Sequence, residues 1–74
     1  MTKTEFVAGL RRVLEWPELA ESTALKGNEK WDSLAQVDVV MFVQDELGHT
    51  LSTAALQQAA TVNDLIALLD GQLT

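Results

Sequence analysis

The chain has no cysteine and only one histidine, His49, among its 74 residues. The lack of cysteine excludes disulfides, a thiolate nucleophile and a cysteine-ligated metal, and a single histidine excludes a metal site built from several imidazoles. No apolar run approaches the roughly 20 residues of a membrane-spanning helix. The first residues also lack the charged-then-apolar pattern of a signal peptide. These absences predict a cytoplasmic protein whose fold depends on packing alone.

Basic side chains are missing from the second part of the chain. Residues 1–30 hold all five Lys and Arg together with five acids, whereas residues 31–74 hold six acids and no Lys or Arg, which accounts for the net charge of −6. Because binding to nucleic-acid phosphates depends on Lys and Arg, this distribution argues against nucleic acid as a partner. It favours basic protein partners, with the plainer alternative that the acids only keep a small domain soluble.

The residues that are present favour one all-helical domain. A length of 74 residues with 47% apolar side chains allows a single globular domain over residues 1–74. Twelve leucines and nine alanines, against one isoleucine and seven valines, favour helix over strand. We therefore predict an all-α fold, a small four-helix bundle with three longer helices, one short third helix and a long first loop.

Apolar spacing and capping residues set the predicted boundaries. We predict helices over residues 4–15, 32–48, 53–58 and 61–73. Thr2 or Thr4 caps the first helix, and Pro17 disfavours helix at the residue before it. The second helix is capped by Asp32 or Ser33 and stops at Gly48, and the last opens with an acidic capping box from Thr61 to Asp64. Its predicted buried stripe is Val62, Leu65, Ile66, Leu69 and Leu73.

A long loop, residues 17–31, separates the first two helices. Its Pro, Gly and Asn and its scattered apolar residues indicate irregular structure, with room for one helical turn near residues 17–20. We expect Leu19 and Leu25 to anchor it to the core. We expect Trp16 and Trp31 at its ends to seal the core, the alternative being that Trp31 faces a partner.

The predicted second helix has apolar residues on two different arcs. With Ser33 at zero and about 100° per residue, one arc near roughly 240° to 340° holds the predicted core residues Val39, Val40, Val43 and Leu47. A second arc, near roughly 40° to 100°, holds Leu34, Val37 and Met41, with Asp38 and Asp45 beside it. An apolar strip edged by carboxylates suits docking onto a basic partner. The alternative is that the long loop folds over this strip and buries it.

Ser33 stands where the loop becomes this helix. A phosphate attached there would meet free N–H groups and the positive end of the helix dipole. The neighbouring Asp32 could help an attacking enzyme hold a metal ion. The plain alternative is that Ser33 is only an N-cap.

The second helix carries the segments Trp31-Asp32-Ser33-Leu34, Val37-Asp38-Val39-Val40-Met41 and Gln44-Asp45-Glu46-Leu47-Gly48. In this order they resemble the start and body of the second helix of an acyl carrier protein. Thr61-Val62-Asn63-Asp64-Leu65 is similar to the opening of the last helix of that family. The resemblance extends from about Phe6 to Leu73 and implies a bundle of the acyl carrier protein type with no catalytic activity of its own.

By this resemblance Ser33 carries 4′-phosphopantetheine, taken from coenzyme A, through a phosphodiester bond. The thiol of that arm would hold an acyl or related group as a thioester, and no metal is implied. The implied partners are a phosphopantetheinyl transferase and acyl-loading and acyl-transfer enzymes with basic docking surfaces. We expect them to meet a monomer at Asp32, Leu34, Val37, Asp38, Met41 and Asp45.

Departures from the fatty-acid carriers point to a different pathway. Those carriers usually have a small residue where this chain has Trp31, and more acids along the helix where it has Ala35, Gln36 and Gln44. This favours a stand-alone carrier for polyketide, peptide, or modified-lipid or saccharide biosynthesis. Two rivals stay open: an unmodified helical interaction module, and a small enzyme using His49. For His49 we favour a structural role against the carbonyls of a helix end.

Overall fold

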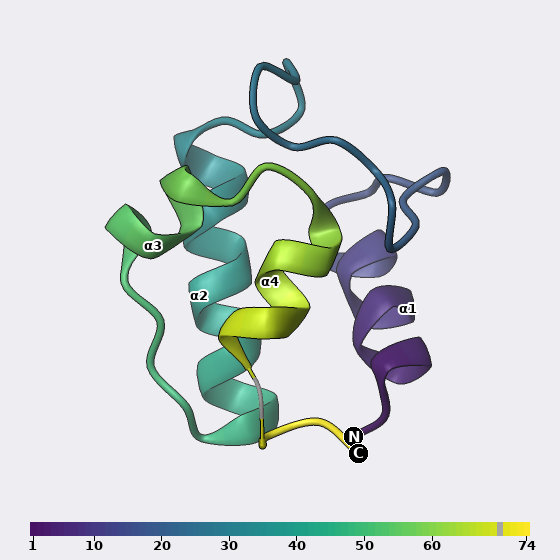
Figure 1. Ribbon diagram of the computed structural model, residues 1–74, viewed down its shortest axis with the longest axis vertical. Helices are drawn as coiled ribbons and strands as arrows, with labels where there is room; N and C mark the ends of the chain where they lie inside the picture. Colours follow the sequence, from purple (N-terminus) through teal and green to yellow (C-terminus); the bar gives the residue numbers. More distant parts are fainter. Residues whose placement is uncertain (70) are drawn as a thin grey trace.

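Four helices make up the part of the fold that the structure describes, and they confirm the all-helical prediction. The structure is a computed structural model that describes residues 1–69 and 71–74. The helices are α1 (Lys3–Val13), α2 (Ser33–Leu47), α3 (Thr53–Gln58) and α4 (Val62–Leu68). In Figure 1, α1 and α2 lie on either side of α4, the short α3 lies beside α2, and the long first loop closes one end. Both chain termini lie at the opposite end (Figure 1).

Helix α1 begins with one of the two predicted caps and ends before the predicted residue. The N–H of Thr2 donates to Glu5 at 2.9 Å and the N–H of Glu5 donates to the Thr2 hydroxyl at 3.1 Å, which forms a capping box. The predicted end at Glu15 is wrong, because Glu15 has left-handed backbone, with φ of 51°. The N–H groups of Glu15 and Trp16 instead bond to carbonyls of the last turn, at Arg12 and Arg11. This is the pattern of a Schellman motif built without glycine.

Helices α2 and α3 keep their predicted boundaries. Asp32 caps α2, and Gly48 ends it with left-handed backbone at φ of 62°, a conformation that favours glycine. Ser52 caps α3 through the N–H of Ala55 at 3.1 Å. These boundaries depend on capping residues next to them in the sequence, which is why the sequence predicts them well.

Helix α4 is shorter than predicted. The N–H of Thr61 donates to the Asp64 carboxylate at 3.0 Å, as the predicted capping box requires, and the N–H of Ala60 donates to the same carboxylate at 2.8 Å. The predicted extension through Leu73 is wrong, because the helix ends at Leu68. Gly71 has left-handed backbone at φ of 86°, and the N–H of Thr74 bonds to the carbonyl of Met1 at 2.9 Å. Leu73 therefore packs on the core from this terminal segment rather than from the helix.

The core is filled by side chains from all four helices and the loop. The largest fully buried side chains are Phe6, Leu10, Leu19, Leu25, Val39, Val43, Leu56, Val62, Leu65 and Leu69. Phe42, which the predicted core arc of α2 omits, is also buried and packs 5.9 Å from the ring of Phe6, centroid to centroid. Gly9 faces the Phe42 ring, so close that a side chain there would overlap it. A glycine at this position therefore lets α1 lie against α2.

The first loop is tied to the core and to the connection between α3 and α4. Leu19 and Leu25 are buried as predicted, and so are Trp16 and Trp31, which excludes a partner-facing Trp31. In place of a helical turn at residues 17–20, the loop begins with a tight turn in which the N–H of Leu19 bonds to the carbonyl of Trp16. Further along, the N–H of Leu25 bonds to the carbonyl of Ala60 at 2.8 Å. None of the described helices is long and apolar enough to cross a membrane.

Candidate functional site

Ser33 is exposed at the first residue of α2, and the structure separates its role from that of Asp32. The Asp32 carboxylate accepts the N–H of Ala35 at 2.8 Å and so caps the helix. The Ser33 hydroxyl takes part in no hydrogen bond among the described residues. The alternative in which Ser33 serves only as the N-cap is therefore wrong, and its hydroxyl is available to another group.

The other two serines of the chain differ from Ser33. The Ser52 hydroxyl caps α3, a helix of six residues, and Ser22 lies in the first loop. Ser33 is the one at the start of a helix of 15 residues. An anion bonded to its hydroxyl would lie at the positive end of the α2 dipole, near N–H groups that the first turn of a helix leaves unpaired.

The apolar strip beside Ser33 is open to solvent. The exposed fractions are 69% for Leu34, 44% for Val37 and 58% for Met41. On the opposite face of α2, Val39 and Val43 are fully buried, and Val40 and Leu47 are partly buried against the core. The first loop does not cover the strip, so the alternative that buried it is wrong.

Two hollows lie along the line where α1 meets α2, which we call the α1–α2 seam. The first, of about 330 Å³, is lined by Asp32, Leu34 and Asp38 together with Val13, Leu14, Glu15, Lys30 and Ala35. The second, of about 310 Å³, is lined by Asp38, Met41 and Asp45 together with Arg12, Val13, Phe42 and Glu46. Val13 and Asp38 border both hollows. Five of the six residues predicted to meet partners therefore lie together along this seam, and Val37 lines neither hollow.

The far wall of the seam is a feature that the sequence does not reveal. It comes from the end of α1 and the two residues after it, through Arg12, Val13, Leu14 and Glu15, and from Lys30 in the loop. The Lys30 ammonium lies 5.5 Å from the centre of the Trp16 ring and 3.8 Å from the Glu18 carboxylate. Val13 and Leu14 are both half-buried; they pack against the core and contribute to the surface as well.

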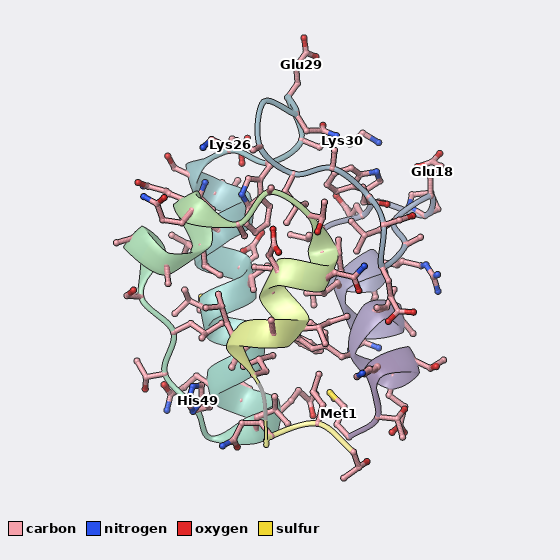
Figure 2. The ribbon with its side chains drawn as sticks, viewed as in Figure 1. Met1, Glu18, Lys26, Glu29, Lys30 and His49 are labelled. Atoms are coloured by element: carbon pink, nitrogen blue, oxygen red, sulfur yellow. The ribbon has the colours of Figure 1, made fainter. Side chains whose placement is uncertain are left out.

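His49 lies away from this site. It follows the end of α2, and Figure 2 shows it at the end of the molecule opposite Lys30. A helix of 15 residues separates it from Ser33 by about 22 Å. The described residues contain no group of acidic, histidine or cysteine side chains that could hold a metal ion.

A family comparison agrees with this geometry. The family model for the phosphopantetheine attachment site matches residues 5–69. The chain belongs to this family. The match confirms the resemblance to acyl carrier proteins, and the protein is a carrier of covalently bound 4′-phosphopantetheine. Members of this family are carriers rather than catalysts. No curated protein and no solved structure matches the chain significantly.

Proposed function

We propose that the carrier holds its phosphopantetheine on Ser33 and uses the arm to bear an acyl or related group as a thioester. The observation that supports Ser33 most directly is its free, exposed hydroxyl at the first residue of a long helix, inside the matched region. The phosphodiester would lie at the positive end of α2, where an anion is stabilised. Because the chain has no cysteine, the arm would supply its only thiol.

The open strip and its acids support a role in presenting the bound group to other proteins. We propose that a phosphopantetheinyl transferase and the acyl-loading and acyl-transfer enzymes dock beside Ser33. Leu34 and Met41 offer apolar contact, and Asp38 and Asp45 offer charges for Lys and Arg on those enzymes. Charges at the rim of an interface mainly steer association. Replacing both Asp38 and Asp45 by Lys should therefore slow modification, and salt should slow the wild-type reaction.

The uncharged start of α2 supports a pathway other than housekeeping fatty-acid synthesis. Ala35 and Gln36 are buried, and so is Trp31, the last residue of the loop before the cap. The first turns of α2 therefore offer few carboxylates for a partner to contact. We propose a dedicated pathway that makes a polyketide, a peptide, or a modified lipid or saccharide.

The attachment is tested by intact mass after incubation with coenzyme A and a phosphopantetheinyl transferase. Wild-type protein should gain the mass of one phosphopantetheine and Ser33→Ala should gain none. Ser52→Ala is the matched control, since it removes a hydroxyl at another helix start and should be modified like wild type. Because Asp32 is the cap, Ser33→Ala should keep its melting temperature, whereas Asp32→Ala should lose about 1 kcal/mol of the free energy of unfolding. A modified Ser33→Ala protein would refute the assignment.

A further inference from the structure

The second hollow of the α1–α2 seam carries both signs of charge, arranged on opposite walls. Asp38, Asp45 and Glu46 line the second hollow from α2, and Arg12 lines it from α1. Among the described residues the single ion pair within 4.0 Å joins Lys30 to Glu18, so Arg12 is not paired with these acids. The free carrier therefore presents a row of carboxylates facing one unpaired guanidinium.

Arg12 differs from its neighbour Arg11 in that its guanidinium does not hold the first loop. The Arg11 Nε–H donates to the carbonyl of Leu19 at 2.7 Å, which holds the first loop against α1. Arg12 is exposed and forms no side-chain hydrogen bond in the described part of the chain. Its position on the seam is thus free to serve an interaction with another molecule.

The side chains that line the hollows favour side chains of a partner protein over the phosphopantetheine arm as the occupant. Four carboxylates border the two hollows from α2 and its cap, at Asp32, Asp38, Asp45 and Glu46, and they would repel the phosphodiester of the arm. Apolar side chains, chiefly Val13, Leu34 and Met41, line the rest. Such a hollow suits the apolar stem of a partner Lys or Arg, whose charged head then reaches the acids. Arg12, on the opposite wall, suits a partner carboxylate.

We infer that partner enzymes dock over the α1–α2 seam, and that a partner carboxylate pairs with Arg12 while partner Lys or Arg side chains enter the hollows. This inference rests on the proposed function, because it takes the phosphopantetheinyl transferase as its first partner. It adds α1 to the docking surface and makes the required partner charges mixed rather than uniformly basic. Mixed charges fix the orientation of a complex as well as its strength.

Reversing the charge of Arg12 distinguishes a mixed partner surface from a purely basic one, because the modification rate should change in opposite directions. Arg12→Glu makes the seam more acidic, so a purely basic transferase should modify it faster, whereas a transferase with a carboxylate opposite Arg12 should modify it more slowly. We expect kcat/KM for modification to fall roughly tenfold, and the fall to shrink as salt rises. Arg12→Gln should show a smaller fall, with melting curves reporting the folding of both variants.

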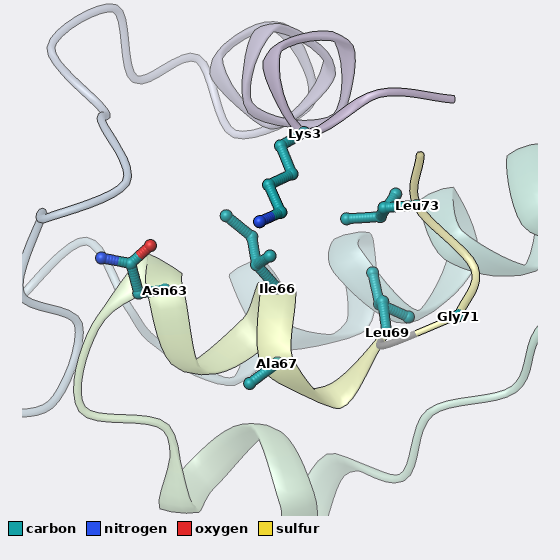
Figure 3. A pocket seen from close by; sticks show the side chains of 7 residues that line it. All are labelled: Lys3, Asn63, Ile66, Ala67, Leu69, Gly71 and Leu73. Carbon is teal, nitrogen blue, oxygen red and sulfur yellow. The ribbon is translucent and has the colours of Figure 1, made fainter.

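Lys3→Glu is the matched control, because it makes the same charge change on α1 at the other end of the molecule. Lys3 borders a separate hollow of about 370 Å³, formed with α4 and the C-terminal segment around Ile66 and Leu73 (Figure 3). The proposed docking leaves this region uncovered, so Lys3→Glu should be modified at close to the wild-type rate. An Arg12→Glu rate equal to or above that of Lys3→Glu would overturn the inference. Failure to modify even the wild type would instead overturn the proposed function.

Methyl NMR tests the same surface without a substitution. On adding transferase in the absence of coenzyme A, the Val13, Leu34 and Met41 methyls should shift, while Ala59 and Leu68, at the groove between α3 and α4, should not. Shifts confined to α3 and α4 would overturn the inference. Val13 shifts that arise on modification alone, with no transferase bound, would assign the hollows to the arm and overturn it as well.

Discussion

Replacing Gly9 by alanine sets two opposing effects against each other at the contact that forms the α1–α2 seam. Alanine is better than glycine in a helix interior by roughly 1 kcal/mol. The new Cβ, however, would lie 2.8 Å from Cε1 of Phe42 and nearer still to Cζ. The Phe42 ring is buried against Phe6 and has little space to move. Overpacking of this kind costs roughly 1–3 kcal/mol.

The clash should outweigh the gain in helix propensity. We expect Gly9→Ala to lower the free energy of unfolding by about 1 kcal/mol, and the melting temperature by roughly 4–8 °C for a domain of this size. Ala8→Gly is the propensity control, because Ala8 is an exposed neighbour in the same helix and its replacement should cost about 1 kcal/mol.

A double-mutant cycle with Phe42→Leu isolates the clash. Leucine lacks the outer ring atoms, so in that background Gly9→Ala should become neutral or stabilising, with a coupling energy of roughly 1–3 kcal/mol between the two positions. Urea denaturation followed by far-UV circular dichroism gives each free energy. A single Gly9→Ala variant that melts above wild type would refute the reasoning.

Three further predictions follow from the same structure. Glu15→Gly should raise the free energy of unfolding by up to about 1 kcal/mol, because glycine tolerates the left-handed backbone that ends α1; a lower melting temperature would contradict this. Val43→Ala should lower the free energy of unfolding by about 2 kcal/mol and Met41→Ala by less than about 0.5 kcal/mol, since only Val43 is buried. A larger loss for Met41→Ala than for Val43→Ala would mean that the core face and the exposed face of α2 are assigned the wrong way round. The hydrogen bond from the Thr2 N–H holds the pKa of Glu5 below its usual value of 4.5, so this interaction stabilises the fold above that pH and is lost as the pH falls through the lowered pKa. Glu5→Gln should therefore lose less stability on acidification than wild type, and an identical acid profile would rule out the linkage.

Local signals in the sequence determine where α2 and α3 begin and end. Asp32, Gly48 and Ser52 act on backbone groups within four residues of themselves, so a cap can be predicted without knowing the tertiary structure. Helical spacing likewise separates Val43 from Met41, because the two faces of one helix have fixed directions. The exposed strip next to Ser33 is predictable for that reason.

Features that depend on tertiary contacts are not predictable in this way. The end of α1 lies at a non-glycine residue in left-handed backbone, Glu15, which no turn signal marks. The place of Leu73 is ambiguous, because both a longer helix and a returning terminal segment bring it to the core. The far wall of the seam, with Arg12 and Val13, requires knowledge that α1 packs on α2 at Gly9.

Peptide mapping by tandem mass spectrometry tests the central claim most directly. After modification of wild-type protein by a phosphopantetheinyl transferase and coenzyme A, the added group should be found on Ser33 alone. Fragment ions should place it at the first residue of α2 and leave Ser22 and Ser52 unmodified. A phosphopantetheine found on either of those serines, or on no residue at all, would contradict the account.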